Sequence, residues 1–146
     1  MNIVAADLAL TGNVTNIGTL GIENILAAGA ITLMGSGGLA IETQTEWNHI
    51  QPSVNFVVLG NTGANVGVID VAAAWINNNS VTVDFKSGGA GKFNVNGVIT
   101  TTTGLGSITV NGSGNSTTIS ADISQASINI TDAIVVDGGM GVGVTR

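Results

Sequence analysis

Apolar and polar residues alternate with a period of two in several short runs, and glycine-rich segments separate these runs. The clearest runs cover residues 39–43, 81–85, 108–110 and 128–130, and a typical separator is the Gly-Ser-Gly-Gly sequence at 35–38. This period is typical of a strand with one buried face, because successive side chains point to opposite sides of the sheet. We therefore predict an all-β chain in which strands and turns alternate about every ten residues.

A second group of short apolar runs raises the expected number of strands to about a dozen or more. These runs cover residues 14–17, 30–34, 56–59, 95–100, 117–123 and 133–136. Weak self-similarity accompanies them, since the Val-Asn-Gly sequence at 95–97 recurs at 110–112. Such repetition favours a β-solenoid (β-helix). A jelly-roll or Greek-key β-sandwich is the alternative, although its core usually contains more aromatic residues than the three Phe and two Trp of this chain.

Two segments depart from the pattern of strands and turns. Residues 43–55 hold the only His, the only Pro and one of the two Trp, and we interpret them as an irregular insertion in a single domain that covers residues 1–146. Residues 70–76 begin with Asp70, a residue type that caps helices, and three Asn follow them. This second segment is predicted to form either one short helix or a strand.

The chain has an unusually small number of charged residues, which changes the expected character of its surface. Only 8% of the residues are charged, against about 25% in an ordinary soluble domain. With so little charge repulsion between copies, we expect self-association through β-edges and apolar contacts. The net charge of −6 and the total of three Lys and Arg argue against nucleic-acid binding. Every apolar run is shorter than the roughly 18 residues of a membrane span, so none is expected.

The first ten residues are apolar on both faces of a would-be strand. Such a strand belongs inside a sheet, either as the first strand of its own domain or as a donor strand that completes the sheet of a neighbouring copy. The candidate donor residues are Ile3, Val4, Ala6, Leu8 and Leu10. No secretory signal peptide is recognisable in residues 1–7. The chain is then expected to be an excised fragment, a protein exported by another route or a virion component assembled inside a cell.

Side chains that carry out catalysis are scarce, and we predict that the chain is not an enzyme. His49 is the only candidate base, with Glu46 three residues before it, and no nucleophile motif accompanies them. The alternative is a glycosidase-type pair of carboxylates drawn from Asp122, Asp132 and Asp137. No cofactor is expected, and Asp137 is a weak candidate ligand for calcium, because hard cations bind carboxylate and carbonyl oxygens.

Residues 12–20 and 104–122 place Thr, Ser, Asn and Gly around isolated Ile, Leu and Val residues. This sequence pattern resembles that of bacterial β-strand-repeat surface proteins, which include autotransporter passengers, filamentous-haemagglutinin-like adhesins and some S-layer proteins. The resemblance implies a β-helical, secreted protein that is adhesive or forms a lattice. It transfers no functional residue, and the insertion at 43–55 departs from it.

These observations lead to a structural rather than a chemical function. The leading hypothesis is a structural subunit or adhesive segment of an extracellular cell-surface assembly, such as a filament, a pilus-like fibre or an S-layer. Its partners are then copies of itself and host or surface glycans. The first alternative is a virion fibre or capsid-decoration protein, and the second is a β-helical module that binds or cleaves carbohydrate.

Overall fold

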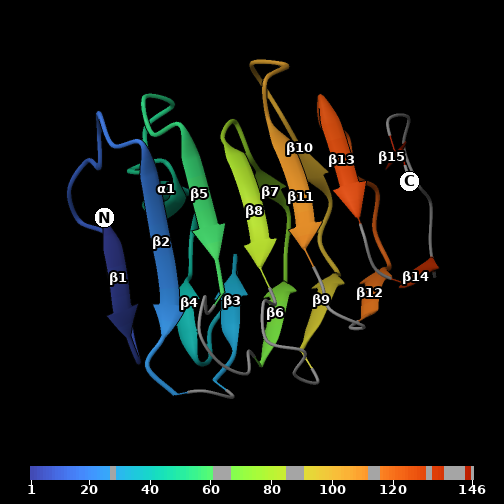
Figure 1. Cartoon of the computed structure of the whole chain (residues 1–146), viewed down its shortest axis with the longest axis horizontal. Coiled ribbons are helices and arrows are strands. Elements are labelled where there is room, and N and C mark those ends of the chain that lie inside the picture. The colour runs from blue at the N-terminus through green and yellow to red at the C-terminus, as the bar shows by residue number, and fades with distance from the viewer. Residues whose placement is uncertain are drawn as a thin grey trace.

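The computed structural model describes residues 1–26, 29–60, 67–84, 91–111, 116–130, 133–136 and 144–145, and most of them lie in or between β-strands. Seven strands form one sheet, here called sheet A (Figure 1). In spatial order they are β1 (Asn2–Ala5), β2 (Thr19–Asn24), β5 (Phe56–Leu59), β8 (Ser80–Asp84), β11 (Ser107–Asn111), β13 (Ser127–Ile130) and β15 (Val144–Thr145). The all-β prediction is confirmed.

Two further sheets accompany sheet A. The six strands of sheet B are, in spatial order, β14 (Ala133–Val136), β12 (Ser116–Ile119), β9 (Lys92–Val95), β6 (Val68–Val71), β3 (Ile31–Leu33) and β4 (Leu39–Ile41). Sheet C consists of β10 (Ile99–Thr100) and β7 (Trp75–Ile76), and an isolated parallel bridge joins Ile99 to Ile123. From β5 onward the chain visits the sheets in turn, and β15 ends at the opposite edge of sheet A from β1.

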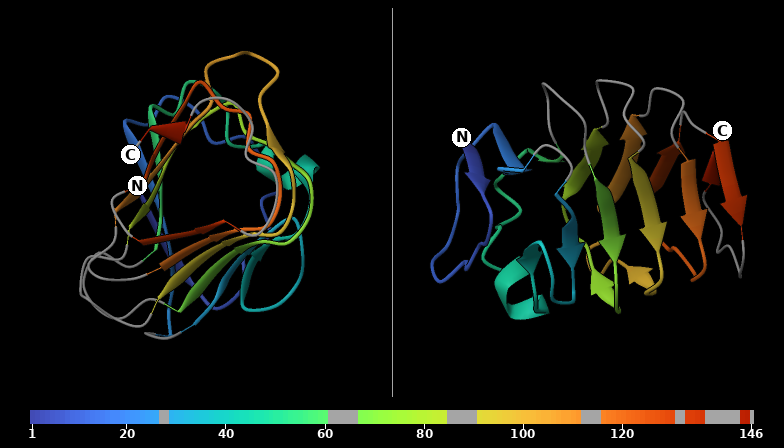
Figure 2. Two further views of the ribbon diagram at one scale, coloured as in Figure 1. Left: turned by 90° about the vertical axis from the view of Figure 1, so that its right-hand side faces the viewer. Right: turned by 90° about the horizontal axis from the view of Figure 1, so that it is seen from below.

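Every strand pair among the described residues is parallel. Parallel neighbours need a long connection between them, and here the strands of the other sheets supply it. The view along the long axis shows the successive strands of each sheet lying behind one another around one path (Figure 2). The jelly-roll and Greek-key alternative differs from this arrangement, because those sandwiches are built from antiparallel strands.

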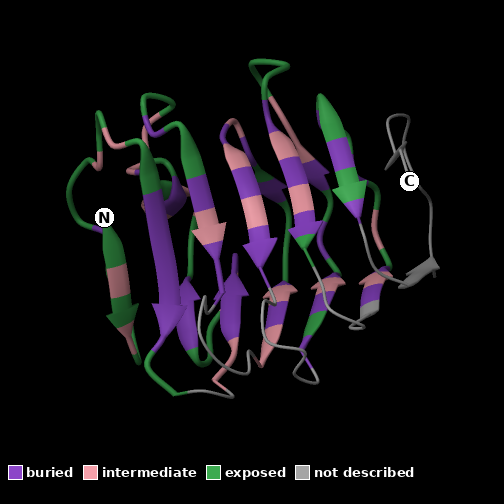
Figure 3. Cartoon of the chain, in the orientation of Figure 1, coloured by how far each residue is buried: buried purple, intermediate pink, exposed green. Residues whose placement is uncertain are grey.

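The inner faces of the sheets form the core. In sheet A, the register aligns one buried residue from each of five strands: Leu20, Val57, Val81, Ile108 and Ile128. Neighbouring members of this row are separated by about 4.8 Å, the spacing of adjacent strands. In each of these strands, the residues that alternate with the core residues face outward, and most of them are half-buried or exposed, as Figure 3 shows by colour. The period-two pattern therefore predicted the buried residues of β11 and β13, whereas Ala40 in β4 and Asp84 in β8 are buried against the pattern.

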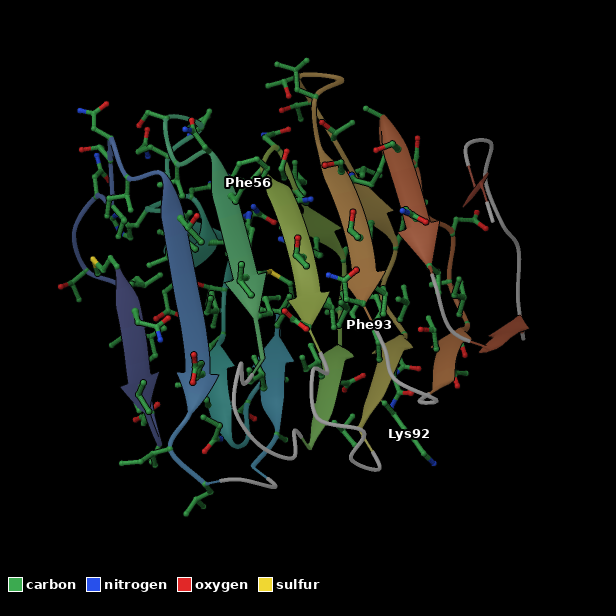
Figure 4. The ribbon with its side chains drawn as sticks, in the orientation of Figure 1. Phe56, Lys92 and Phe93 are labelled. Carbon is green, nitrogen blue, oxygen red and sulfur yellow. The ribbon has the colours of Figure 1, made fainter. Side chains whose placement is uncertain are left out.

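Aromatic residues occupy two places in the core. Phe93 of β9 is buried beside Ile69, and its neighbour Lys92 points outward to solvent (Figure 4). Trp47 and Trp75 are each 1% exposed, and their rings pack edge to face with centroids 4.8 Å apart. The Trp pair joins the insertion to sheet C, because the two residues come from α1 (Gln44–Trp47) and β7.

Local predictions failed at two segments. The helix considered for residues 70–76 is wrong, because Asp70 pairs in β6 with Thr32 and Asn94, and residues 75–76 form β7. The insertion instead contains the short helix α1, whose N-cap Thr43 accepts a hydrogen bond from the Glu46 amide. In both segments the neighbouring strands, which the local sequence does not reveal, decide the backbone conformation.

Several of the predicted strands are shorter than expected; for example, the run 117–123 gives β12, which ends at Ile119. Within residues 14–17, only Val14 pairs, in an isolated bridge with Ile50. Residues 95–100 form the end of β9 and the whole of β10, with a corner between them at Gly97. A Cβ atom at Gly97 would collide with the backbone of Ala73, so glycine permits the close approach of these two corners.

Candidate functional site

One edge strand bounds each of the two larger sheets at the end of the molecule where the chain begins, and only the edge strand of sheet A has exposed residues. β1 is the outermost strand of sheet A at this end, and β4 is the outermost strand of sheet B. Both lie toward the same end of the molecule (Figure 1). An edge strand leaves backbone N–H and C=O groups on one side without a strand partner, so it is a template for another chain.

β1 is held in place by its own chain. It pairs with β2 from Asn2 to Ala5, and the Gly21 amide donates a hydrogen bond of 2.9 Å to the Met1 carbonyl. The terminal ammonium donates to the Thr19 carbonyl at 2.8 Å. The Asn2 side chain donates to Glu23 Oε1 at 2.9 Å. The structure therefore places β1 as the first strand of its own sheet, and its donation to a neighbouring copy stays a prediction.

The five candidate donor residues do not share one environment. Leu10 is buried, Ile3 and Leu8 are half-buried against the core, and Val4 and Ala6 are exposed. The expected burial on both faces is therefore incomplete, because Ile3 packs against the core while Val4, which points to the other face of the strand, is exposed. Leu10 also donates its amide hydrogen bond to the Glu46 carboxylate at 3.3 Å, which ties the segment after β1 to α1.

Exposed apolar residues gather around β1. The Ile25 amide donates to the Ala5 carbonyl at 2.9 Å, which places the turn after β2 beside the end of β1. Met1 is 61% exposed, Val4 52%, Ile25 60% and Leu26 65%. We call these four residues and Ile3 the end surface. Figure 3 shows that β1 is exposed or half-buried along its length, whereas β2 beside it is largely buried.

The structure gives His49 and Glu46 separate partners. His49 Nδ1 lies 2.9 Å from Asn13 Oδ1 on the surface. The Glu46 carboxylate accepts the amide of Glu42 at 2.8 Å as well as that of Leu10. The Glu46 side chain therefore binds backbone groups around α1.

Of the three candidate acids, Asp122 lies in the described part of the chain. Its backbone carbonyl accepts the Ile99 amide at 2.9 Å, in the bridge that extends sheet C. Asp132 and Asp137, and with Asp137 the weak calcium candidate, lie outside the described residues. Within the described ranges no three His, Asp or Glu side chains gather in a way that could hold a metal ion.

The threonines after β10 surround one asparagine. Asn78 Oδ1 accepts hydrogen bonds from Thr101 Oγ1 at 3.0 Å, from the Thr102 amide at 2.9 Å and from the Thr103 amide at 3.3 Å. The Asn78 Nδ2 atom donates to Thr102 Oγ1 at 3.0 Å. These bonds hold the loop whose tip, Leu105, is 73% exposed.

A groove lies between this loop and the insertion, and the sequence did not predict it. It consists of two adjoining hollows of about 280 and 450 Å³ that share Pro52, Asn78 and Asn79 in their walls. Residues 47–56 form one wall and residues 76–80 form the other, with Leu105 at the edge. The irregular composition of 43–55 marked the first wall. The second wall could not be found from the sequence, because it depends on which strands are neighbours.

Comparisons with protein-family models, with curated proteins and with solved structures gave no significant match for this chain. In the described part of the chain, no helix is long and apolar enough to cross a membrane.

Proposed function

We propose that this chain is a β-solenoid subunit of an extracellular assembly whose copies stack end to end through the edge of sheet A. The proposal rests chiefly on one observation, the exposed apolar end surface around the edge strand β1. The function is then mechanical and adhesive.

The order of the strands supports the solenoid. In sheet A the chain returns to aligned positions at Val57, Val81, Ile108, Ile128 and Val144, each time after passing through sheet B or sheets B and C. Each return adds one parallel strand beside the previous one. A chain that repeats this path forms a stack of coils, in which each coil contacts only its neighbours.

The composition of the first coil supports stacking. A soluble solenoid needs a terminal repeat with a polar outer face. Natural sheets also protect their edges with Lys, Pro or bulges. Here β1 reads Asn-Ile-Val-Ala, without a charged or protective residue, and half of its residues are exposed. The residues of β4 are instead buried, and α1 packs beside them. An unprotected edge with exposed apolar neighbours is stabilised when another copy covers it.

End-to-end contact also suits the direction of the strands. β15 and β14 are the outermost strands of sheets A and B at the far end. A second copy with its β1 beside β15 would extend sheet A with a parallel strand. Such a head-to-tail contact does not close on itself, so it generates a filament.

The test is the assembly state of the purified protein, measured by sedimentation velocity over a range of concentrations and by electron microscopy. The double variant Val4→Lys/Leu26→Lys places two charges on the end surface at exposed positions. We expect it to weaken association about tenfold or more, because stacking would bury both charges. The matched control is Val98→Lys, at a 43% exposed position outside the end surface.

The outcomes separate clearly. Filaments of the wild-type protein and of Val98→Lys, together with monomers of the double variant, support the proposal. A wild-type protein that stays monomeric at high concentration contradicts it, and so do filaments that the double variant leaves intact. Circular dichroism of the variants checks that the β-structure is retained.

A further inference from the structure

We infer that the groove between residues 47–56 and Leu105 binds a neutral oligosaccharide chain. The inference is independent of end-to-end stacking, because none of the groove residues belongs to the end surface.

The lack of ionisable side chains in the groove indicates which class of ligand it would bind. None of the residues that line the two hollows is ionisable. A phosphate, a carboxylate or an amine would lose its hydration there without gaining an opposite charge. A ligand without charge and with many hydroxyl groups loses less, because amide and hydroxyl side chains can replace its bonds to water.

The groove offers such side chains without a competing partner. The exposed Asn55 side chain and the Ser80 hydroxyl have no hydrogen-bond partner in the described part of the chain. An amide supplies both donors and an acceptor, and a hydroxyl supplies both roles at once. These groups match sugar hydroxyls, which also donate and accept.

The two walls of the groove are held at a fixed separation. Asn79 Nδ2 donates to the Gln51 carbonyl at 3.2 Å, which joins the corner before β8 to the insertion. Asn78 binds the threonine loop on the other side. A binding site that is formed before the ligand arrives loses less conformational entropy on binding.

An exposed aromatic ring completes the site. Phe56 begins β5 and is 53% exposed, on the outer face of sheet A (Figure 4). It lines the larger hollow together with Pro52 and Leu105. An isolated exposed Phe next to hydrogen-bonding groups provides an apolar platform for the C–H face of a sugar ring.

The outer face of sheet A favours a chain over a single sugar. Ser80, Ser107 and Ser127 stand in register on three neighbouring strands, about 4.8 Å apart. Thr82 and Thr109 form a second row of hydroxyl groups beside them. The larger hollow, which Ser80 lines, therefore opens onto a regular row of hydroxyl groups along which a linear ligand would continue.

The test is isothermal titration calorimetry of the full chain with cellohexaose, chitohexaose, maltohexaose and mannohexaose, and with an alginate hexamer as the anionic comparison. We expect at least one neutral hexamer to bind, and Phe56→Ala and Asn55→Ala each to weaken its binding about tenfold. The control is Asn94→Ala, a half-buried residue on the outer face of sheet B, which should leave the affinity unchanged.

Other outcomes overturn the inference. These are the absence of binding to all four neutral hexamers, tighter binding of alginate, and unchanged affinity in Phe56→Ala. If Phe56→Ala loses its β-structure by circular dichroism, Leu105→Ser replaces it, because that side chain stands at the edge of the groove and is mostly exposed. Unchanged affinity in Leu105→Ser together with Asn55→Ala then contradicts the site.

Discussion

Replacement of Asn77 by alanine should destabilise the fold more than any substitution of an exposed asparagine. Asn77 is fully buried at the corner before β8. Its Nδ2 atom donates to the Asn79 carbonyl at 3.0 Å and to Gln125 Oε1 at 2.8 Å, and its Oδ1 atom accepts the Asn79 amide at 3.0 Å. Gln125 lies at the corner before β13, so one side chain joins two corners far apart in sequence.

The corner between them shows how closely these groups pack. It precedes β11 and contains Gly106, where an added Cβ atom would collide with the Asn77 carbonyl and the Gln125 side chain. A larger residue in place of Gly106 could not fill the space that Asn77→Ala leaves, because it would still collide with the Asn77 carbonyl. The three corners therefore form one column of hydrogen-bonded and closely packed groups.

The magnitude follows from the bonds that are lost. Asn77→Ala removes three hydrogen bonds of 2.8–3.0 Å, each of which contributes about 1 kcal/mol net, and a longer one of 3.4 Å to the Ser107 carbonyl. It also leaves the Asn79 amide without its acceptor. We expect the free energy of unfolding to fall by about 3 kcal/mol, a large share of the roughly 5–15 kcal/mol of a typical domain.

Equilibrium unfolding in urea, followed by the fluorescence of Trp47 and Trp75, measures this loss. With a urea dependence of about 1–3 kcal/mol per molar, the midpoint should fall by about 1–3 M. The control is Asn129→Ala, an exposed position on β13, where the change should stay within about 0.5 kcal/mol. Equal effects of the two substitutions would refute the reasoning.

A double-mutant cycle isolates the contact between the two corners. Gln125→Ala alone and together with Asn77→Ala should give a coupling free energy of about 1 kcal/mol, because the two amides share the 2.8 Å hydrogen bond. Strictly additive effects would show that this bond contributes nothing to stability.

Two further substitutions test the core and a corner. Thr117 is fully buried beside Phe93, and its hydroxyl has no hydrogen-bond partner among the described residues. Thr117→Val should therefore raise the free energy of unfolding by about 1 kcal/mol, and a decrease would mean that the hydroxyl is satisfied. Gly97→Ala should lower it by about 1–3 kcal/mol in the same urea assay, because the new Cβ collides with Ala73, whereas Gly12→Ala, with no atom within 4 Å, should be nearly neutral.

The local pattern predicted much of each strand. Val81 and Val83 are buried and Thr82 between them is half-buried, as period-two alternation requires. The pattern failed where two structures suit the same residues. Residues 71–74 are Val-Ala-Ala-Ala, which suits either a helix or extended backbone, and the pairing of Asp70 with Thr32 and Asn94 decided for the strand.

The candidate sites were less predictable than the strands. The apolar beginning of the chain was visible in the sequence, but the exposure of Val4 was not, because the sequence does not show which face of a strand the rest of the fold covers. The groove was invisible, because its walls come from segments around Pro52, Asn78 and Leu105. Segments so far apart in sequence become neighbours only through the strand order.

The sequence alone determined that this chain is rich in strands, which face of several strands is buried and how few charged residues the chain has. These properties follow from the period of the side chains and from composition, which are local. Only the tertiary structure decided which strands are neighbours, that all the described pairs are parallel, and where the end surface and the groove lie. Any strand can form backbone hydrogen bonds with any other strand. The choice of partner and the register therefore depend on how the side chains of many strands, distant in sequence, pack together.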